Sequence, residues 1–150
     1  MPQSLSSILI HLVFSTKNRE PWITDAIETE LHQYIGGILR DCKCPSLLIG
    51  GDRDHIHILF VLSRTRTVAD LVEEIKSSSS KWIKTKGQEF QQFKWQAGYG
   101  AFSIGQSNVP ALRQYISNQK AHHRNAGFQD EFRSLCRKYE VGIDEQYVWD

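Results

Sequence analysis

Residues 55–62 read His-Ile-His-Ile-Leu-Phe-Val-Leu, an apolar run that follows the polar, glycine-containing stretch 50–54. Alternate residues of a strand face the same way, so His55 and His57 are expected on one face and the isoleucines beside them on the other, in the core. A shorter apolar stretch, 46–49, precedes the polar residues. Two apolar runs around a polar turn predict a β-hairpin with a longer loop.

Segments with strand or helix periodicity flank this hairpin on both sides. In chain order the expected elements are a strand over 8–14, a helix over 25–38, the hairpin strands over 46–49 and 55–62, a helix over 68–83, a strand over 99–104, a helix from Pro110 to about residue 125 and a last helix over 128–139. The order β-α-β-β-α-β predicts an α+β fold of the split βαβ (ferredoxin-like) type, an antiparallel sheet with helices on one face. The C-terminal helices are extra, and the other face of the sheet is expected to stay free for nucleic acid or a partner.

Composition bounds the class of protein. With 150 residues, 40% apolar and 23% charged, the chain is expected to form a single domain, 1–150. The formal net charge of +1 argues against a uniformly basic protein that coats nucleic acid, but it permits local basic patches. No apolar run approaches the ~20 residues that a membrane span needs. Three cysteines and no recognisable signal peptide indicate a reducing cytoplasm.

Two pairs of side chains carry the chemistry. Tyr115 and Gln119 are four residues apart on a predicted helix, so they share a face. If that helix meets the strand of His55 and His57, the site holds two nitrogen ligands, one amide oxygen and one phenol. Those are the parts needed to cut and rejoin a phosphodiester with a bound divalent metal. Each pair alone has a simpler interpretation: solvated histidines at a strand end, and a half-buried packing tyrosine.

Acidic and basic side chains lie beside these candidates. Asp52 and Asp54 flank the histidines and could act as a metal ligand or as an acceptor that orients an imidazole. Candidate contacts to nucleic acid are the basic residues near Trp82 and on the tyrosine helix: Lys81, Lys84, Arg113, Lys120 and Arg124. A hydrated helix surface explains the same residues equally well.

Taken together, these motifs resemble a known family. A His-hydrophobe-His strand followed by Tyr-x-x-x-Gln on a later helix is similar to the single-tyrosine HUH transposases of small insertion sequences and the related REP-associated tyrosine transposases. The resemblance extends over nearly the whole chain: residues 11–17 resemble the first strand of the family, 54–59 its metal strand, Trp95 with Gly98-Tyr99 a recurring aromatic stretch, and 115–119 its nucleophile helix. Phe14 stands where a tryptophan is common in the family.

The resemblance implies a role for each matched residue. Tyr115 would attack the scissile phosphate to give a free 3′-hydroxyl and a 5′-phosphotyrosine. His55, His57 and Gln119 would hold Mg²⁺ or Mn²⁺, with Asp52 as a further candidate ligand. The implied partner is single-stranded DNA folded into hairpins. The implied assembly is a homodimer whose sites could be shared between subunits, with residues 105–108 as the tether; no nucleotide cofactor and no membrane is involved.

Three alternatives stay open at this point. A catalytically inactive or domesticated hairpin-binding regulator would keep the sheet and lose cutting, although it would not need all four site residues. A small metal-dependent hydrolase would activate water with the histidines and leave Tyr115 and Gln119 unexplained. A domesticated transposase that acts on chromosomal palindromes would have the same protein sequence features as the enzyme of a mobile element.

Overall fold

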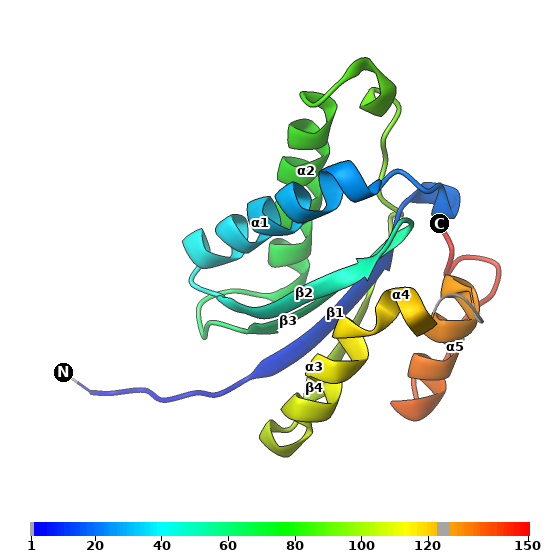
Figure 1. The fold of residues 1–150 in the computed structure, drawn as a ribbon. Helices are drawn as coiled ribbons and strands as arrows, with labels where there is room; N and C mark the ends of the chain where they lie inside the picture. The colour runs from blue at the N-terminus through cyan, green and yellow to red at the C-terminus, as the bar shows by residue number, and fades with distance from the viewer. Residues whose placement is uncertain (1, 123–126) are drawn as a thin grey trace.

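The structure, a computed structural model, describes residues 2–122 and 127–150. It confirms an α+β fold with a four-stranded antiparallel sheet (Figure 1). The strands are β1 (Leu9–Ser15), β2 (Ser46–Asp52), β3 (His55–Val61) and β4 (Gly100–Ile104). The helices are α1 (Asp25–Asp41), α2 (Val68–Lys84), α3 (Val109–Ser117), α4 (Gln119–His122) and α5 (Phe128–Lys138), with short 3₁₀ turns η1 (Lys17–Arg19), η2 (Gln88–Phe90) and η3 (Gln106–Asn108).

The sheet has the order β2-β3-β1-β4, which is the split βαβ arrangement expected from the sequence. Strand β1 lies between β3 and β4, and its register with β3 runs from Leu9 opposite Val61 to Ser15 opposite His55. Every residue of β1 is buried. A strand whose two faces are both apolar is covered on both faces, which fits the central place of β1 in the sheet.

Helices α1 and α2 cover one face of the sheet and bury the main hydrophobic core against it (Figure 1). The isoleucines between and after the two histidines, Ile56 and Ile58, point into this core and are fully buried. Helix α2 begins as predicted, because the Thr67 hydroxyl accepts a hydrogen bond from the Asp70 amide at 3.1 Å. The serine run 77–80 lies inside the helix and not in a linker.

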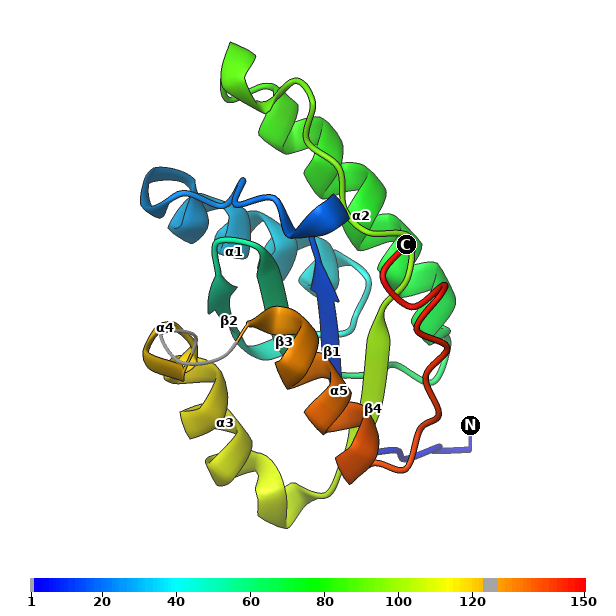
Figure 2. The same cartoon turned by 90° about the vertical axis from the view of Figure 1, so that its right-hand side faces the viewer.

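Helices α3, α4 and α5 cover the opposite face (Figure 2). The expectation that this face stays free was therefore wrong. The sheet presents apolar side chains here as well, among them Val13, Leu59 and Phe102, and these pack against the apolar stripes of α3 and α5. Leaving such side chains in water would forfeit about 1.5–3 kcal/mol for each large apolar residue.

The hairpin between β2 and β3 is tighter than the sequence suggests. Strand β2 continues to Asp52, so the turn consists of Arg53 and Asp54 alone, and the expected longer loop does not exist. Gly50 belongs to β2, where it pairs with His57, and α3 packs closely onto it: a Cβ at that position would lie 2.6 Å from a side-chain carbon of Ile116. The glycine is a site of close packing and not a turn residue.

The helix expected from Pro110 onward is interrupted. Helix α3 ends at Ser117, Asn118 is its C-cap, and α4 begins at Gln119. The expected end of this helix near residue 125 lies outside the described residues. Within the described ranges, no helix is both long and apolar enough to cross a membrane.

Candidate active site

Strand β3 points His55 and His57 at α3, α4 and α5, and both side chains are fully buried. The Nδ1 atom of His55 lies 2.8 Å from an Asp54 carboxylate oxygen, and its Nε2 atom lies 2.8 Å from the Gln119 side-chain oxygen. In the sequence the histidines follow directly after a polar stretch, which would leave them accessible at the end of a long turn. They are instead enclosed, because the turn is short and the C-terminal helices close over the strand.

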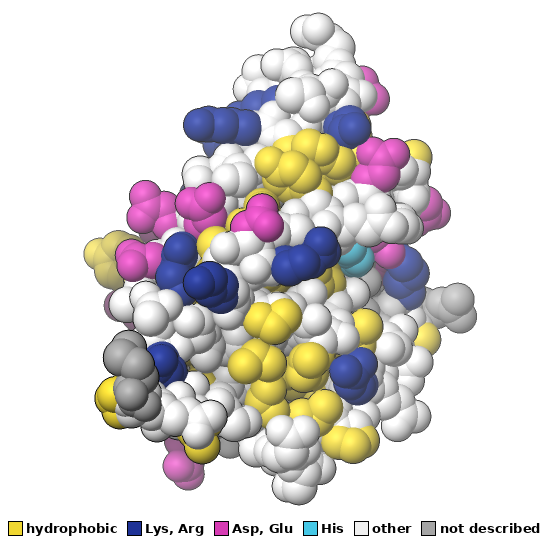
Figure 3. All heavy atoms as spheres, turned by 90° about the vertical axis from the view of Figure 1, so that its left-hand side faces the viewer, with side chains coloured by type: hydrophobic (Ala, Val, Ile, Leu, Met, Phe, Trp, Pro, Cys, Tyr) yellow, Lys and Arg dark blue, Asp and Glu magenta, His cyan; other side chains and the backbone are white. Residues whose placement is uncertain are grey.

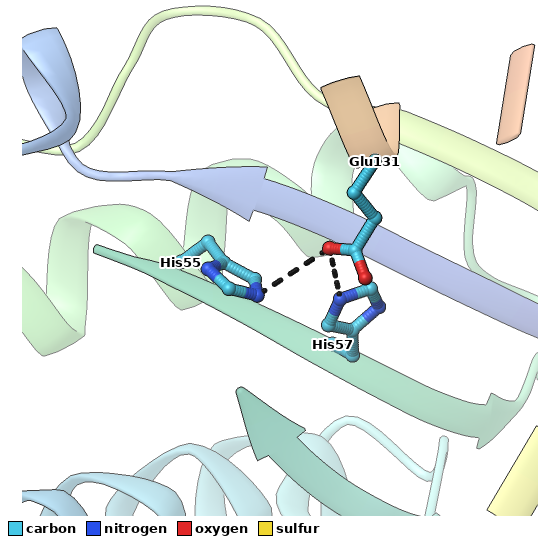
Figure 4. A group of neighbouring side chains, drawn as sticks. All are labelled: His55, His57 and Glu131. Atoms are coloured by element: carbon cyan, nitrogen blue, oxygen red, sulfur yellow. Dashed lines mark hydrogen bonds and ion pairs between the residues drawn. The ribbon is translucent and has the colours of Figure 1, made fainter. Parts of the chain in front are cut away.

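A carboxylate from α5 joins the two histidines. Glu131 is only 3% exposed, and its Oε1 atom lies 3.1 Å from His57 Nε2 and 3.5 Å from His55 Nε2 (Figure 4). One ligand atom from each of these three residues lies within 4.8 Å of the others. Two imidazole nitrogens and a carboxylate oxygen directed at a common point are a suitable donor set for a divalent cation. The residues present therefore fit a metal.

Tyr115 contacts the same carboxylate. The half-buried phenol donates its hydrogen bond to Glu131 Oε2, and its ring stands edge-on to the His57 ring with centroids 5.7 Å apart. Burial, together with the hydrogen bond to Glu131, raises the pKa of Tyr115 well above its ordinary value. The side chain is thus a neutral phenol near pH 7, and its proton already points at an acceptor.

Gln119 remains next to Tyr115 although the helix breaks between them. Its amide nitrogen lies 3.4 Å from the Tyr115 carbonyl oxygen and 3.0 Å from Glu131 Oε2, while its side-chain oxygen faces His55. Gln119 is 1% exposed. The fold thus brings together the four principal site residues named from the sequence: His55, His57, Tyr115 and Gln119.

The remaining sequence candidates lie outside this centre. The Asp52 carboxylate lies 3.7 Å from the Lys120 ammonium and does not belong to the cluster of two histidines and Glu131. Lys120 also pairs with Glu28 at 2.7 Å, and Arg113 is exposed on α3. Lys81 and Lys84 lie on α2, in the other helical layer, and Arg124 lies outside the described residues.

The surface charge is mixed. Figure 3 shows one face of the molecule, on which lysine and arginine side chains lie among acidic ones and around exposed hydrophobic groups. Basic charge on that face is not gathered into a single stripe. The net charge of +1 agrees with this distribution and disfavours binding by charge alone.

A pocket of about 450 Å³ adjoins Tyr115 between α3 and α5. Leu112 and Tyr139 line its sides, Lys138 contributes a positive charge, and Glu131 belongs both to the pocket and to the histidine cluster. The pocket gives the enclosed centre a route to the surface on the side of the tyrosine.

Two residues of the site were missed at the level of sequence. The helical spacing of apolar residues over 128–139 predicts a packing helix and assigns Glu131 no role. The signal was nevertheless present: Glu131 lies three residues after Phe128 and four before Leu135, so a carboxylate occupies the core-facing side of the helix. His11 stands alone in an otherwise apolar strand, and no motif in the sequence assigns it a role; in the structure it is fully buried beside His57.

A helical tyrosine set against a His-x-His strand in a split βαβ sheet defines a class, the single-tyrosine transposases. Comparison with known proteins supports this class. The family model described as "Transposase IS200 like" matches residues 4–119, so the chain belongs to the IS200-like transposase family. Among curated proteins no match is found.

Two solved structures share the fold. A protein from Deinococcus radiodurans R1, described as a candidate transposase, matches with a TM-score of 0.62 at 19% identity, over 79% of this chain and 98% of that one. A REP-associated tyrosine transposase bound to a REP hairpin matches with a TM-score of 0.62 at 15% identity, over 82% of this chain and 72% of that one. At these identities the likeness supports the fold and leaves the chemistry to be argued from the site.

Proposed function

We propose that this transposase cuts and rejoins single-stranded DNA at hairpin-flanked sites through a 5′-phosphotyrosine on Tyr115, with a divalent cation bound at His55 and His57. One observation carries the proposal: the Tyr115 phenol and the ligand nitrogens of both histidines meet on the single carboxylate of Glu131. A packing tyrosine and two structural histidines have no need of a shared buried charge.

The cation would be held by the Nε2 atoms of His55 and His57 together with oxygen from Glu131 or Gln119. Carboxylate and amide oxygens are ligands that suit Mg²⁺ and Mn²⁺. When bound, such a cation supplies positive charge that polarises the oxygens of the scissile phosphate. Asp54 supports this arrangement, because its carboxylate accepts the Nδ1 proton of His55 and leaves Nε2 to face the site.

The covalent step balances without water or a nucleotide. The Tyr115 oxygen forms a bond to the phosphorus, the bond from phosphorus to the 3′-oxygen breaks, and the phenol proton passes to Glu131, which accepts it already in the resting geometry. Glu131 can then pass this proton to the departing 3′-oxygen, which becomes a free hydroxyl. Because one phosphodiester replaces another, a 3′-hydroxyl can later displace Tyr115 and rejoin strands.

The proposed substrate is a single strand that carries a hairpin. The structurally similar REP-associated transposase is bound to a REP hairpin, and the common fold supports the same class of ligand for this chain. Arg113 and Lys120 lie on the helices beside Tyr115 and Gln119, where they could contact phosphates that flank the cut.

The geometry of the site also bears on how subunits share it. Within one chain the phenol of Tyr115 already lies against His57 and Glu131, which supports an active site built by a single subunit. The homodimer expected from the family resemblance is compatible with this, provided that each subunit uses its own tyrosine.

The test is covalent capture of DNA. Purified protein is mixed with hairpin-containing single-stranded DNA from the flanks of its own gene, labelled at the 5′ or the 3′ end, in Mg²⁺, Mn²⁺ or EDTA. We expect a denaturation-resistant adduct that contains the 3′-labelled fragment only, that needs metal and that is lost in Tyr115→Phe. Tyr147→Phe is the matched control, since Tyr147 is 61% exposed and lies after the end of α5.

Each other outcome points to one of the alternatives. Hairpin binding without an adduct in any metal would replace the proposal with a DNA-binding regulator that does not cut. Cleavage without an adduct would indicate a metal-dependent hydrolase. Cleavage that survives Tyr115→Phe would show that another group is the nucleophile.

A further inference from the structure

A third histidine stands behind the site. His11 lies on the central strand β1, is fully buried, and places its Nε2 atom 2.8 Å from Nδ1 of His57 on the neighbouring strand. The two rings are stacked, with centroids 5.1 Å apart and an angle of 22° between their planes. The proposed cleavage step does not use His11.

The contact decides which nitrogen of His57 is available. A neutral imidazole carries one proton, so a ring that donates from Nδ1 has a lone pair on Nε2. In His57 the Nε2 atom is the one that faces Glu131 at 3.1 Å and belongs to the candidate metal cluster. A hydrogen-bond acceptor at Nδ1 therefore fixes both the tautomer and the direction in which His57 offers its ligand nitrogen.

The two histidines of the motif are held in the same way by different groups. His55 has its Nδ1 atom 2.8 Å from the Asp54 carboxylate, and His57 has its Nδ1 atom 2.8 Å from the His11 ring. A carboxylate can only accept, whereas an imidazole nitrogen can accept or donate. When His57 donates from Nε2 to Glu131, His11 can donate to Nδ1 of His57. When Nε2 of His57 binds a cation, His11 can instead accept the hydrogen bond from Nδ1 of His57.

We propose that His11 is a positioning residue that holds His57 through the Nε2–Nδ1 hydrogen bond with the Nε2 atom of His57 directed at the metal. This rests on the proposed function, because it assumes a cation at His55 and His57. The proposed role of His11 does not depend on which subunit supplies Tyr115. Both partners lie on paired strands of the sheet, so the contact persists whichever subunit supplies Tyr115.

His11 also has room to carry its proton on the other nitrogen. Among the described residues its Nδ1 atom has no hydrogen-bond partner, and His11 forms part of the wall of the pocket beside Tyr115. When His57 donates to Nε2 of His11, the His11 proton must sit on Nδ1, the nitrogen for which the described residues provide no other partner.

Two substitutions separate positioning from packing. His11→Phe keeps a ring in a place already next to Phe102 but removes the nitrogen that lies 2.8 Å from Nδ1 of His57. His11→Gln keeps an amide oxygen that can accept from that nitrogen. By titration calorimetry of metal-free protein with MnCl₂, we expect His11→Phe to weaken the affinity for Mn²⁺ by about 10–100-fold and His11→Gln to recover most of it. Similar thermal unfolding of both variants in EDTA shows that the fold is retained.

A spectroscopic measurement on the wild-type protein keeps the inference testable if a variant fails to fold. In nitrogen-15 NMR of the histidine rings with saturating Mg²⁺, we expect His57 to carry its proton on Nδ1. A proton on Nε2 of His57 would overturn the inference, as would Mn²⁺ affinity in His11→Phe equal to that of the wild type.

Failure of the inference and failure of the proposed function give different results. If His57→Ala binds Mn²⁺ as tightly as the wild type, the cation does not use His57 and the proposed metal site is wrong. If His57→Ala loses Mn²⁺ binding while His11→Phe keeps it, the metal site stands and only the role of His11 is contradicted.

Discussion

The two faces of the sheet are formed by the same strands, but one packs a continuous apolar core and the other also buries polar side chains. On the side of α1 and α2, Leu12, Ile58 and Phe60 belong to one continuous hydrophobic core. On the side of α3–α5, the apolar contacts divide into two smaller clusters, and the buried polar group of His11, His57 and Glu131 lies on the same face. Buried polar groups cost stability unless each finds a partner, so a protein retains such a cluster where the chemistry requires it.

Adjacent residues of β3 test this contrast most strongly. Ile58→Ala removes a fully buried side chain from the main core and should lower the free energy of unfolding by about 2–5 kcal/mol, without changing the metal dependence of cleavage in the folded protein. His57→Ala should abolish metal-dependent cleavage and lower stability less, because Glu131 keeps Tyr115 and Gln119 as partners. Urea unfolding and the adduct assay measure the two effects. A larger loss of stability from His57→Ala than from Ile58→Ala would contradict this difference between the two faces.

A single added methyl group at Gly50 tests how closely α3 packs onto β2. Gly50→Ala places a methyl group 2.6 Å from a side-chain carbon of Ile116 and 2.9 Å from its carbonyl oxygen, and should cost about 1–3 kcal/mol. Gly37→Ala, in α1 with open space around it, should instead stabilise by about 0.5–1 kcal/mol. Thermal unfolding of the pair checks the signs, and equal effects would mean that α3 does not approach the sheet this closely.

Glu131 joins the two histidines of β3 to α5, so its charge should matter more than its volume. Glu131→Gln should weaken Mn²⁺ binding by about tenfold or more while the fold is kept, because a neutral amide is a poorer ligand than a carboxylate. Asp130→Asn is the matched control on the same helix, since Asp130 is exposed and forms an ion pair with Arg133. Calorimetry distinguishes the two variants, and equal affinities would remove Glu131 from the metal site.

The buried imidazole of His11 should make stability depend on pH. Burial, and secondarily the neighbouring His57, lower the pKa of His11 to about 3, against a smaller opposing effect of Glu131; Lys138 also lowers it. Between pH 6.5 and 3 the unfolded chain binds a proton at His11 that the folded chain does not. Acidification through this window should therefore reduce stability, by up to ~1.4 kcal/mol per pH unit. Urea unfolding in EDTA at pH 7, 6 and 5 should show a steeper decline for the wild type than for His11→Gln; parallel declines would contradict it.

The sequence predicts the fold well where a pattern is periodic and local. Strand β1, the hairpin strand of His55, the serine run inside α2 and the final helix follow from alternation or helical spacing. Where tertiary packing decides, the sequence is less informative. The glycine pair 50–51 resembles a turn, but Gly50 lies in β2 opposite His57, and Ile116 of α3 approaches it closely.

The site follows the same rule. The resemblance identified His55, His57, Tyr115 and Gln119, and the fold brings them together. Glu131 and His11 could not be assigned in this way, because a lone carboxylate on an apolar stripe and a lone histidine in an apolar strand acquire their meaning only from the partners that the fold supplies. The expectation of an open sheet face failed for the same reason: nothing local shows that α3–α5 fold back over β1 and β3.

The most direct test of the central claim is to find which atom of the protein carries the DNA. The covalent complex formed with hairpin-containing single-stranded DNA and Mn²⁺ is digested with protease and nuclease, and the modified peptide is sequenced by mass spectrometry. The account predicts nucleotides linked through a 5′-phosphate to Tyr115, and no adduct in EDTA. Linkage to another residue, or cleaved DNA with no linked peptide, would contradict it.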